Sequence, residues 1–374
     1  MKNYYCILLL FIVLSCNTTK TDPQNPSQHT SNPTAPPSPI KAKNIILLIG
    51  DGMGLSQITA AMYANKNRIN LEKFPVVGLQ KTHASDKLVT DSAASATSLA
   101  SGVKTYCGAT GVDTDTVAVK TILELAEEKG MATGLVATST IVHATPACFY
   151  AHEKRRNLYE NIAADLLDLE VDYFVGGGKK YFDRRDSDDR NLVDELKKKG
   201  YMISDYFTEP FGQVITPNKK NFGYFTSDSD PLPVSKGRSY LYAATKLGIK
   251  FLKKRSDRGF FLMAEGSQID WGGHANDSDY IVSELLDFDR VVGNALDFAK
   301  KNGETLVIVT ADHETGGYSV LQNSTMDSLV TAFTTSYHTA SMIPVFAYGP
   351  GSEAFGGVYD NTTIFYKMKK ALGL

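Results

Sequence analysis

Three short segments concentrate the side chains that bind metal ions. The longest, "MAEGSQIDWGGHAND" (263–277), places Glu265, Asp270 and His274 within ten residues. Asp270 and His274 are four positions apart, so they share one face of a helix or meet across a turn. Carboxylate with imidazole is a ligand set that zinc accepts. The segment therefore predicts ligands for a metal ion.

The second segment, "TADHETGG" (310–317), follows an apolar run and holds the adjacent residues Asp312 and His313. Neighbouring residues that leave a strand can converge on one ion where the backbone turns. "SYHTAS" (336–341) adds His338 shortly afterwards. His313 stands beside an acid, which favours metal binding over an isolated core or surface role. His338 precedes the last expected strand and is a further candidate ligand.

The third segment, "GDGMG" (50–54), carries Asp51 on a glycine-rich turn after an apolar run. It lacks the G-x-G-x-x-G spacing of a dinucleotide loop, and its carboxylate would repel a pyrophosphate. An acid on a tight turn at the end of a strand suits a cation better. "VGGGKK" (175–180) lacks the Walker spacing and is interpreted as a structural turn.

Two further segments contain a candidate nucleophile and positively charged side chains. "VTDSAASATSLASG" (89–102) offers four serines, and composition alone does not choose among them, because a serine must be activated by a base or a metal. "IVHATPACFYAHEKRRN" (141–157) contains a basic run, in which an arginine can hold two phosphate oxygens at once. Spacing does not say which arginine points inward. The candidates are Ser92, Ser95, Ser98, Ser101, His143, Thr145, Lys154, Arg155 and Arg156.

The elements that must position these residues are apolar strands alternating with amphipathic helices. This alternation predicts an α/β fold with a mostly parallel central sheet covered by helices on both faces. The expected strands are 44–49, 133–138, 172–175, 259–264, 305–310 and 342–348, and the expected helices are 116–130, 240–255 and 283–303.

Three of the acids, Asp51, Glu265 and Asp312, come just after expected strands. Ligands of open α/β sheets bind at the carboxyl ends of the strands, so these carboxylates should meet at one edge. They would repel one another there unless cations lay between them. The layout itself therefore indicates a metal site.

The N-terminus predicts an exported protein. Residues 1–15 resemble a secretory signal whose apolar run is too short to span a bilayer, and the residues before Cys16 resemble a bacterial lipobox. Residues 17–43 hold six of the 14 prolines and predict a disordered tether. The folded domain should occupy 44–374, with a more polar peripheral insertion at about 182–238.

The net charge bears on nucleic-acid binding, and the cysteine content bears on disulfide formation. The net charge is −2, or −3 once a signal carrying Lys2 is removed, which gives no reason to expect a nucleic-acid partner. Cys107 and Cys148 would remain in an oxidising compartment, either paired or as free thiols.

Together the motifs resemble the alkaline phosphatase family. "GDGMG", "VTDSAASAT", "SGVKTY", "HATPA", "EGSQIDWGGHA", "TADHETGG" and "HTA…PVFAYGPGS" occur in the family's order and cover nearly all of 44–356. The short form with Trp271 is most similar to enzymes of marine and cold-living bacteria. The resemblance implies an alkaline phosphatase-like fold and hydrolysis of a broad range of phosphate monoesters through a phosphoserine intermediate on Ser92.

The resemblance also implies two zinc ions and one magnesium ion. It assigns Asp270, His274 and His338 to one zinc, Asp51, Asp312 and His313 to the other, Asp51, Thr145 and Glu265 to magnesium with His143 just outside these ligands, and Ser92, Arg156 and Trp271 to phosphate.

Three departures from the best-known bacterial pattern affect these expectations. His143 replaces an aspartate near the magnesium site, and Trp271 replaces a lysine that helps to bind phosphate. Only 25 positions separate His313 from His338, where the family often has a long insertion. The short connection predicts an open entrance and leaves monomer and homodimer as alternatives.

Three other functions fit parts of this sequence pattern. A phosphodiesterase of the same superfamily is the main alternative. A sulfatase would need a modifiable residue in a motif that the sequence lacks, and a non-catalytic metal-binding lipoprotein would not need every catalytic position.

The expected partners are small phosphate monoesters, with membrane contact only through a lipid on Cys16. The expected location is periplasmic or at the cell surface, with the anchor in the outer membrane.

Overall fold

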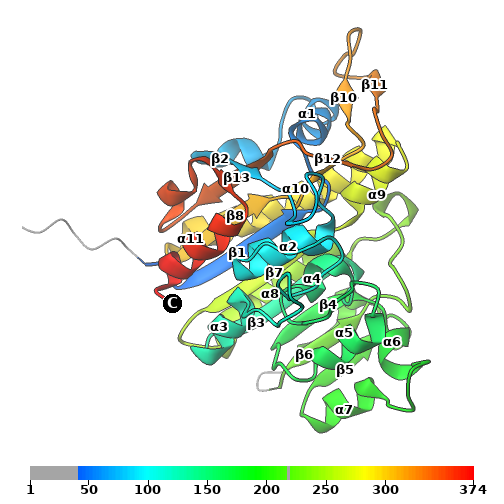
Figure 1. Ribbon diagram of the computed structural model, residues 1–374, viewed down its shortest axis with the longest axis vertical. Coiled ribbons are helices and arrows are strands. Elements are labelled where there is room, and N and C mark those ends of the chain that lie inside the picture. The colour runs from blue at the N-terminus through cyan, green and yellow to red at the C-terminus, as the bar shows by residue number, and fades with distance from the viewer. Residues whose placement is uncertain (1–40, 217–219) are drawn as a thin grey trace, which may run out of the picture. The chain divides into compact units, whose positions relative to one another are not determined.

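A ten-stranded sheet organises the protein (Figure 1). The computed structural model describes residues 41–216 and 220–374, which belong to one compact unit. In spatial order the strands are β14 (Gly357–Asp360), β2 (Val76–Lys81), β13 (Ile343–Tyr348), β8 (Thr305–Thr310), β1 (Asn44–Gly50), β7 (Phe260–Gly266), β3 (Ala132–Thr140), β4 (Tyr173–Gly177), β6 (Phe222–Phe225) and β5 (Met202–Asp205). Among these strands only β13 runs antiparallel to its neighbours. The predicted mostly parallel sheet is confirmed.

Two small antiparallel pairs lie outside this sheet. β9 (Glu314–Thr315) pairs with β12 (His338–Thr339), and β10 (Ser319–Val320) pairs with β11 (Thr331–Ala332). The first pair matters for the site because it sets His338 opposite Thr315. The second forms the extension at the top of Figure 1.

Helices surround the sheet. They are α1 (Leu55–Ala64), α2 (Ser92–Ser101), α3 (Ile122–Glu128), α4 (Ala144–Ala147), α5 (Tyr159–Asp165), α6 (Lys180–Asp183), α7 (Leu192–Lys198), α8 (Tyr240–Arg255), α9 (Gln268–His274), α10 (Ser278–Asn302) and α11 (Thr362–Leu372). Short 3₁₀ helices occupy Asn70–Lys73, Phe211–Gln213, Val234–Lys236 and Ser352–Phe355.

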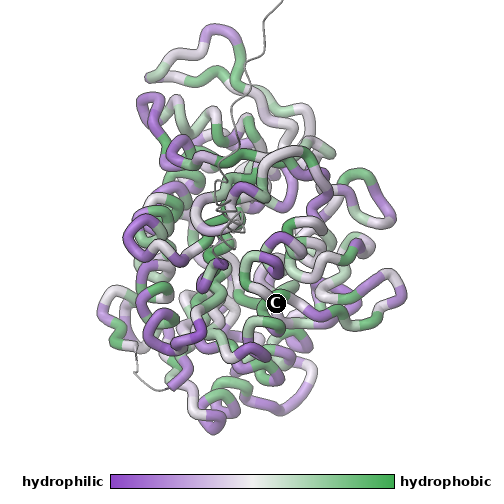
Figure 2. Tube along the Cα trace, turned by 90° about the vertical axis from the view of Figure 1, so that its left-hand side faces the viewer, coloured by the Kyte–Doolittle hydropathy of each residue, from purple (hydrophilic) through white to green (hydrophobic). Residues whose placement is uncertain are grey.

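Strand β1 shows how both faces of the sheet are buried. Ile45, Leu47 and Ile49 pack into a core with residues of α2, α3, α5, α7 and α11. The alternate residues Ile46 and Leu48 pack into a second core with α1, α8 and α10. In Figure 2 polar stretches lie mainly on the outer helices and loops. A strand buried on both sides reads as a continuous apolar run, which is why β1 was predictable.

The expected helix 116–130 is mostly wrong in its extent. Only α3 is helical there, because Thr121 and Glu124 form a capping box that starts the helix at Ile122. Helix α8 matches the prediction, and α10 begins five residues early because Asp277 caps it. The half-exposed strand β2 was not predicted.

Residues 182–238, expected as a peripheral insertion, contribute to the central sheet. β5 and β6 lie within this segment and extend the sheet beyond β4, all three strands running parallel. Its polar stretches connect these strands. The segment thus forms one edge of the main layer.

Both ends of the described chain meet at the amino edge of the sheet. The Ala42 N–H donates to the carbonyl of Ala371 (3.0 Å), and β1 begins two residues later. The predicted signal peptide (1–15), Cys16 and most of the predicted tether (17–43) lie outside the described residues. Within 41–216 and 220–374, no helix has the length and apolar character needed to cross a membrane.

Candidate active site

Four neighbouring strands deliver the site at their carboxyl ends. Asp312 follows β8, Asp51 follows β1, Glu265 lies near the end of β7, and His143 follows β3. Gly52 allows this convergence, because its φ is +71° and a Cβ there would come within 2.7 Å of the Asp270 backbone. The predicted edge of convergent carboxylates is therefore present.

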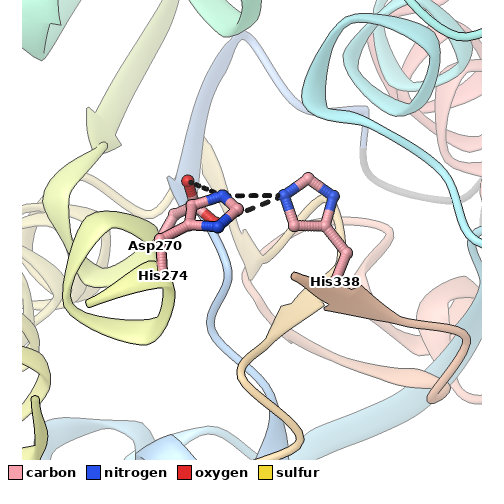
Figure 3. Close-up of side chains that lie close together, drawn as sticks. All are labelled: Asp270, His274 and His338. Atoms are coloured by element: carbon pink, nitrogen blue, oxygen red, sulfur yellow. Dashed lines mark hydrogen bonds and ion pairs between the residues drawn. The ribbon is translucent and has the colours of Figure 1, made fainter. Parts of the chain in front are cut away.

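The first metal group consists of Asp270, His274 and His338 (Figure 3). Helix α9 presents Asp270 and His274 one turn apart, with 3.3 Å between Oδ2 and Nε2. His338 reaches the same point from β12, and its Nε2 lies 3.5 Å from Asp270 Oδ1. Of the two arrangements that the four-residue spacing allowed, a shared helical face is therefore the one observed.

Backbone carbonyls fix the orientation of both imidazoles in the first metal group. His274 Nδ1 lies 2.7 Å from the carbonyl of Ser336, and His338 Nδ1 lies 2.8 Å from that of Thr90. A carbonyl only accepts, so each neutral ring keeps its lone pair on Nε2. The two Nε2 atoms are 3.2 Å apart. Two lone pairs at that distance repel, and a cation between them turns the repulsion into ligation.

The second metal group consists of Asp51, Asp312 and His313, all fully buried. His313 Nε2 lies 3.1 Å from Asp312 Oδ2 and 3.5 Å from Asp51 Oδ1. Ser92 joins this group, with its Oγ 3.2 Å from His313 Nε2. Among the candidate serines, the structure brings Ser92 to the imidazole of this metal group.

The third metal group consists of Asp51, His143 and Glu265, whose ligand atoms lie within 4.8 Å of one another. The Thr145 hydroxyl and His143 Nδ1 are buried without hydrogen-bond partners among the described residues. His143, expected just outside the magnesium ligands, lies close enough to Asp51 and Glu265 to offer a ligand atom to the same ion. Its ring meets Trp271 edge-on, with 6.1 Å between centroids.

The electrostatics of these groups fit cations. Burial, then the charges of Asp312 and Asp270, raise the pKa of Asp51 well above its usual range, and burial raises the pKa of Glu265 to about 8. No oxygen of either carboxylate accepts a hydrogen bond of good geometry from the described residues. Buried carboxylates without partners are costly, and bound cations would satisfy them.

Helix α2 positions Ser92 at its first residue. The Asp91 carboxylate caps the helix by accepting from the Ala94 N–H (3.0 Å), which leaves Ser92 at the positive end of the helix dipole. Further along, Ser95 donates to the carbonyl of Asp312 (2.7 Å). Ser98 bonds back to the Ala94 carbonyl. Ser95, another of the candidate serines, thus ties α2 to the second metal group.

Asp91 also holds Arg156. The guanidinium donates to Asp91 Oδ2 at 3.0 Å, whereas Arg155 is exposed. Burial alone would raise the pKa of Asp91, but the charge of Arg156 and the cap to Ala94 lower it below its usual value. The ion pair answers the question that spacing left open, because Arg156 is the arginine that lies beside Ser92's helix.

Two supporting residues were missed by sequence reasoning. Thr315 donates to Asp270 Oδ1 at 2.5 Å and lies 3.3 Å from His313 Nδ1, so it bridges the first and second metal groups. The carboxylate of Glu314 accepts from Gln57 of α1 and from Thr339, the residue after His338. Both residues lie in the "TADHETGG" segment, beside the predicted ligands.

The remaining cysteines are free thiols. Cys148 is fully buried and donates to the carbonyl of Ala93 on α2 (3.2 Å), and Cys107 is half-buried. Of the two alternatives considered from the sequence, free thiols are the one observed.

Buried carboxylate–imidazole groups surround a serine at the start of a helix, at the carboxyl edge of a mostly parallel sheet. This combination defines a metal-dependent hydrolase with a serine nucleophile. The chain belongs to the alkaline phosphatase family, whose sequence pattern matches residues 42–332 and 321–374. It is a phosphomonoesterase of that family.

Named relatives agree in sequence and structure. Alkaline phosphatase 3 of Bacillus subtilis (strain 168) is 37% identical over 417 residues, which cover 88% of this chain and 89% of the relative. The solved alkaline phosphatase of the Antarctic bacterium TAB5 is 45% identical with a TM-score of 0.84, covering 90% of this chain and 99% of that one. A TAB5 variant with histidine replaced by aspartate has magnesium bound in its M3 site; it is 44% identical, with the same TM-score and coverage.

Proposed function

We propose that phosphate monoesters are hydrolysed here through a phosphoserine on Ser92. The observation that carries this assignment is the position of Ser92 Oγ, 3.2 Å from His313 Nε2, at the first residue of α2. A phosphate dianion resists an anionic nucleophile, so the chain must neutralise and position charge. The helix terminus and the Arg156 guanidinium both favour a phosphate at this point.

We further propose that zinc binds at the first and second metal groups and magnesium at the third. The imidazole nitrogens of His274, His338 and His313 suit zinc at the first and second groups. At the third group the oxygens of Asp51, Thr145 and Glu265 suit magnesium, with His143 beside them. When bound, these ions supply positive charge that acidifies the serine hydroxyl, stabilises the departing alkoxide and activates water. The unpartnered carboxylates and facing imidazole nitrogens support this proposal.

The residues then act in a fixed order. Arg156 holds two non-bridging oxygens while Ser92 Oγ forms a bond to phosphorus and the alcohol leaves on the side of the first metal group. Water then attacks the phosphoserine from the vacated side and releases inorganic phosphate. Two in-line displacements at one phosphorus give net retention, so an inverted product from a chiral phosphate ester would rule out the covalent route.

Replacing the nucleophile tests this assignment. Ser92→Ala should lower the hydrolysis of p-nitrophenyl phosphate by about 10³-fold or more, because the remaining site can only position water. Ser98→Ala, on the same helix but bonded to the Ala94 carbonyl, is the matched control and should remain active. Metal content measured on each variant separates loss of chemistry from loss of the site. Full activity of Ser92→Ala would overturn the assignment.

The alternative activity is tested with the same proteins. A phosphodiester keeps two free oxygens and a single charge, whereas a monoester dianion offers three oxygens and two charges to Arg156 and to the cations proposed here. We expect the bis-ester, bis-p-nitrophenyl phosphate, to be a much poorer substrate than the monoester. A preference for the bis-ester would favour the phosphodiesterase.

We also propose export and lipid attachment at Cys16. The apolar run, the lipobox-like residues before Cys16 and the proline-rich stretch after it support this proposal. Incorporation of labelled palmitate into the full chain, and its loss in Cys16→Ser, would test it. Wild-type protein that incorporates no labelled palmitate would contradict lipid attachment at Cys16.

A further inference from the structure

Tyr337 ends a stack of three aromatic rings that reaches from the site to the surface. Its ring lies parallel to that of His338, with 4.4 Å between centroids and 9° between planes. On its other face, His338 stacks against His313 at 3.5 Å and 17°. His313 is fully buried, whereas Tyr337 is 53% exposed. The stack therefore has a buried end in the second metal group and an open end at Tyr337.

The backbone, rather than the phenol hydroxyl, holds this ring in place. The Tyr337 carbonyl accepts from the Gly316 N–H (2.9 Å), and its N–H donates to the Thr335 hydroxyl (3.1 Å). Among the described residues the phenol oxygen has no hydrogen-bond partner. One face of the ring is covered by His338, so the exposed area includes the opposite face. A fixed aromatic ring with a free face is suited to stacking.

This ring also borders the first metal group directly. The His274 ring lies 5.9 Å from that of Tyr337, tilted by 54°. Both imidazoles of the first metal group thus contact Tyr337. In the proposed function, the alcohol leaves on this side of the phosphorus.

We propose that Tyr337 is a specificity-determining residue whose free face stacks on the alcohol portion of the substrate. This inference rests on the proposed function, because it uses the side from which the alcohol departs. The favoured substrates are monoesters of planar alcohols, such as phenols and nucleosides, since aromatic rings and bases offer a π-face for stacking. Small alkyl phosphates would gain nothing from the ring.

A purely structural role for Tyr337 predicts a different result. If the ring only supported His338, its removal would impair hydrolysis of every monoester equally. The two roles are therefore separated by comparing planar and non-planar substrates in the same variant.

The test compares Tyr337→Leu with Tyr337→Phe. Tyr337→Leu should lower kcat/KM for phenyl phosphate and adenosine 5′-monophosphate by about three- to tenfold, the range expected for one aromatic stack. It should change kcat/KM for glycerol phosphate by less than about twofold. Tyr337→Phe should keep the preference for planar substrates. Tyr366→Leu, an equally exposed tyrosine (56%) beside the opposite end of α2, is the matched control.

A binding measurement provides a readout without turnover. Benzylphosphonate and methylphosphonate carry P–C bonds, so calorimetry on the intact metal-loaded enzyme reports affinity alone. Tyr337→Leu should weaken benzylphosphonate by the same three- to tenfold and leave methylphosphonate unchanged. Equal losses for both, or no loss for either, would overturn the proposal. Both of these results would leave the proposed phosphomonoesterase mechanism unaffected. Full activity of Ser92→Ala would instead contradict that mechanism, independently of how the phosphonates bind.

Discussion

The His143 imidazole meets the Trp271 indole edge-on, with 6.1 Å between ring centroids and 74° between planes. These are two positions at which the sequence departs from the best-known bacterial pattern, and the fold makes them neighbours. Burial and the nearby charge of Arg156 lower the pKa of His143 to about 3, so the ring is neutral. A neutral nitrogen and an apolar ring thus replace an acid and an ammonium. Because the rings touch, substitutions at the two positions should not act independently.

Replacing His143 by aspartate should increase magnesium binding. The His143→Asp carboxylate adds a hard oxygen to the third metal group, and magnesium prefers oxygen ligands. We expect about tenfold tighter magnesium binding, measured by metal analysis after equilibrium dialysis. His143→Asn has the same size without the charge and serves as the control. Equal magnesium content in both variants would contradict this prediction.

Replacing Trp271 by lysine should strengthen inhibition by inorganic phosphate. The substitution Trp271→Lys adds a positive charge at a position where the family pattern has one. A single added charge near a partly exposed anion contributes about 1 kcal/mol, or roughly fivefold in the inhibition constant. Trp271→Met is the uncharged control. An unchanged inhibition constant in Trp271→Lys would refute the role assigned to this position.

Replacing Asp91 by asparagine should separate its two contacts. Asparagine caps helices as well as aspartate, so stability should change little, whereas the ion pair to Arg156 is lost. We expect inorganic phosphate to inhibit less strongly, with a larger inhibition constant, because the guanidinium is no longer held beside Ser92. Asp91→Ala also removes the cap and should cost about 1 kcal/mol more in the free energy of unfolding. Unchanged phosphate inhibition in Asp91→Asn would show that Arg156 is positioned by other contacts.

Removing the metals should make stability depend on pH. The metal-free site raises the pKa of Glu265 to about 8, mainly through burial. A carboxyl whose pKa is raised on folding binds more protons when folded, so stability is present at low pH and falls as pH rises from about 4.5 to 8. Thermal unfolding in EDTA should therefore show a falling Tm over this range. The metal-loaded protein should not show that fall, and parallel curves for both would argue against ligation by these carboxylates.

The strands that carry the site were predictable because each is buried on both faces. Strands β1, β7 and β8 appear in the sequence as unbroken apolar runs followed by acids. Strand β2 was missed because part of it is exposed, and β5 and β6 because each has only four residues within a polar region. Burial on both faces, rather than β propensity, supplied the signal.

Contacts between residues far apart in the chain could not be predicted from sequence patterns. Asp91 and Arg156 are 65 positions apart, and nothing in "EKRR" distinguishes Arg156 from Arg155. The position of His143 among the third metal group and the stacking of Tyr337 on His338 depend on backbone geometry after β3 and in β12. Such relationships are tertiary, and local patterns carry no information about them.

The hydrogen bond from Ala42 to Ala371 has a practical consequence. Both ends of the described chain leave from the amino edge of the sheet, while Asp51 marks the carboxyl end of the seven-residue strand β1, about 23 Å away. A resin or a fused protein joined directly at residue 41 or at the C-terminus would therefore attach at the edge opposite the catalytic mouth. Immobilised in this way, the enzyme would present its site outward to dissolved substrate.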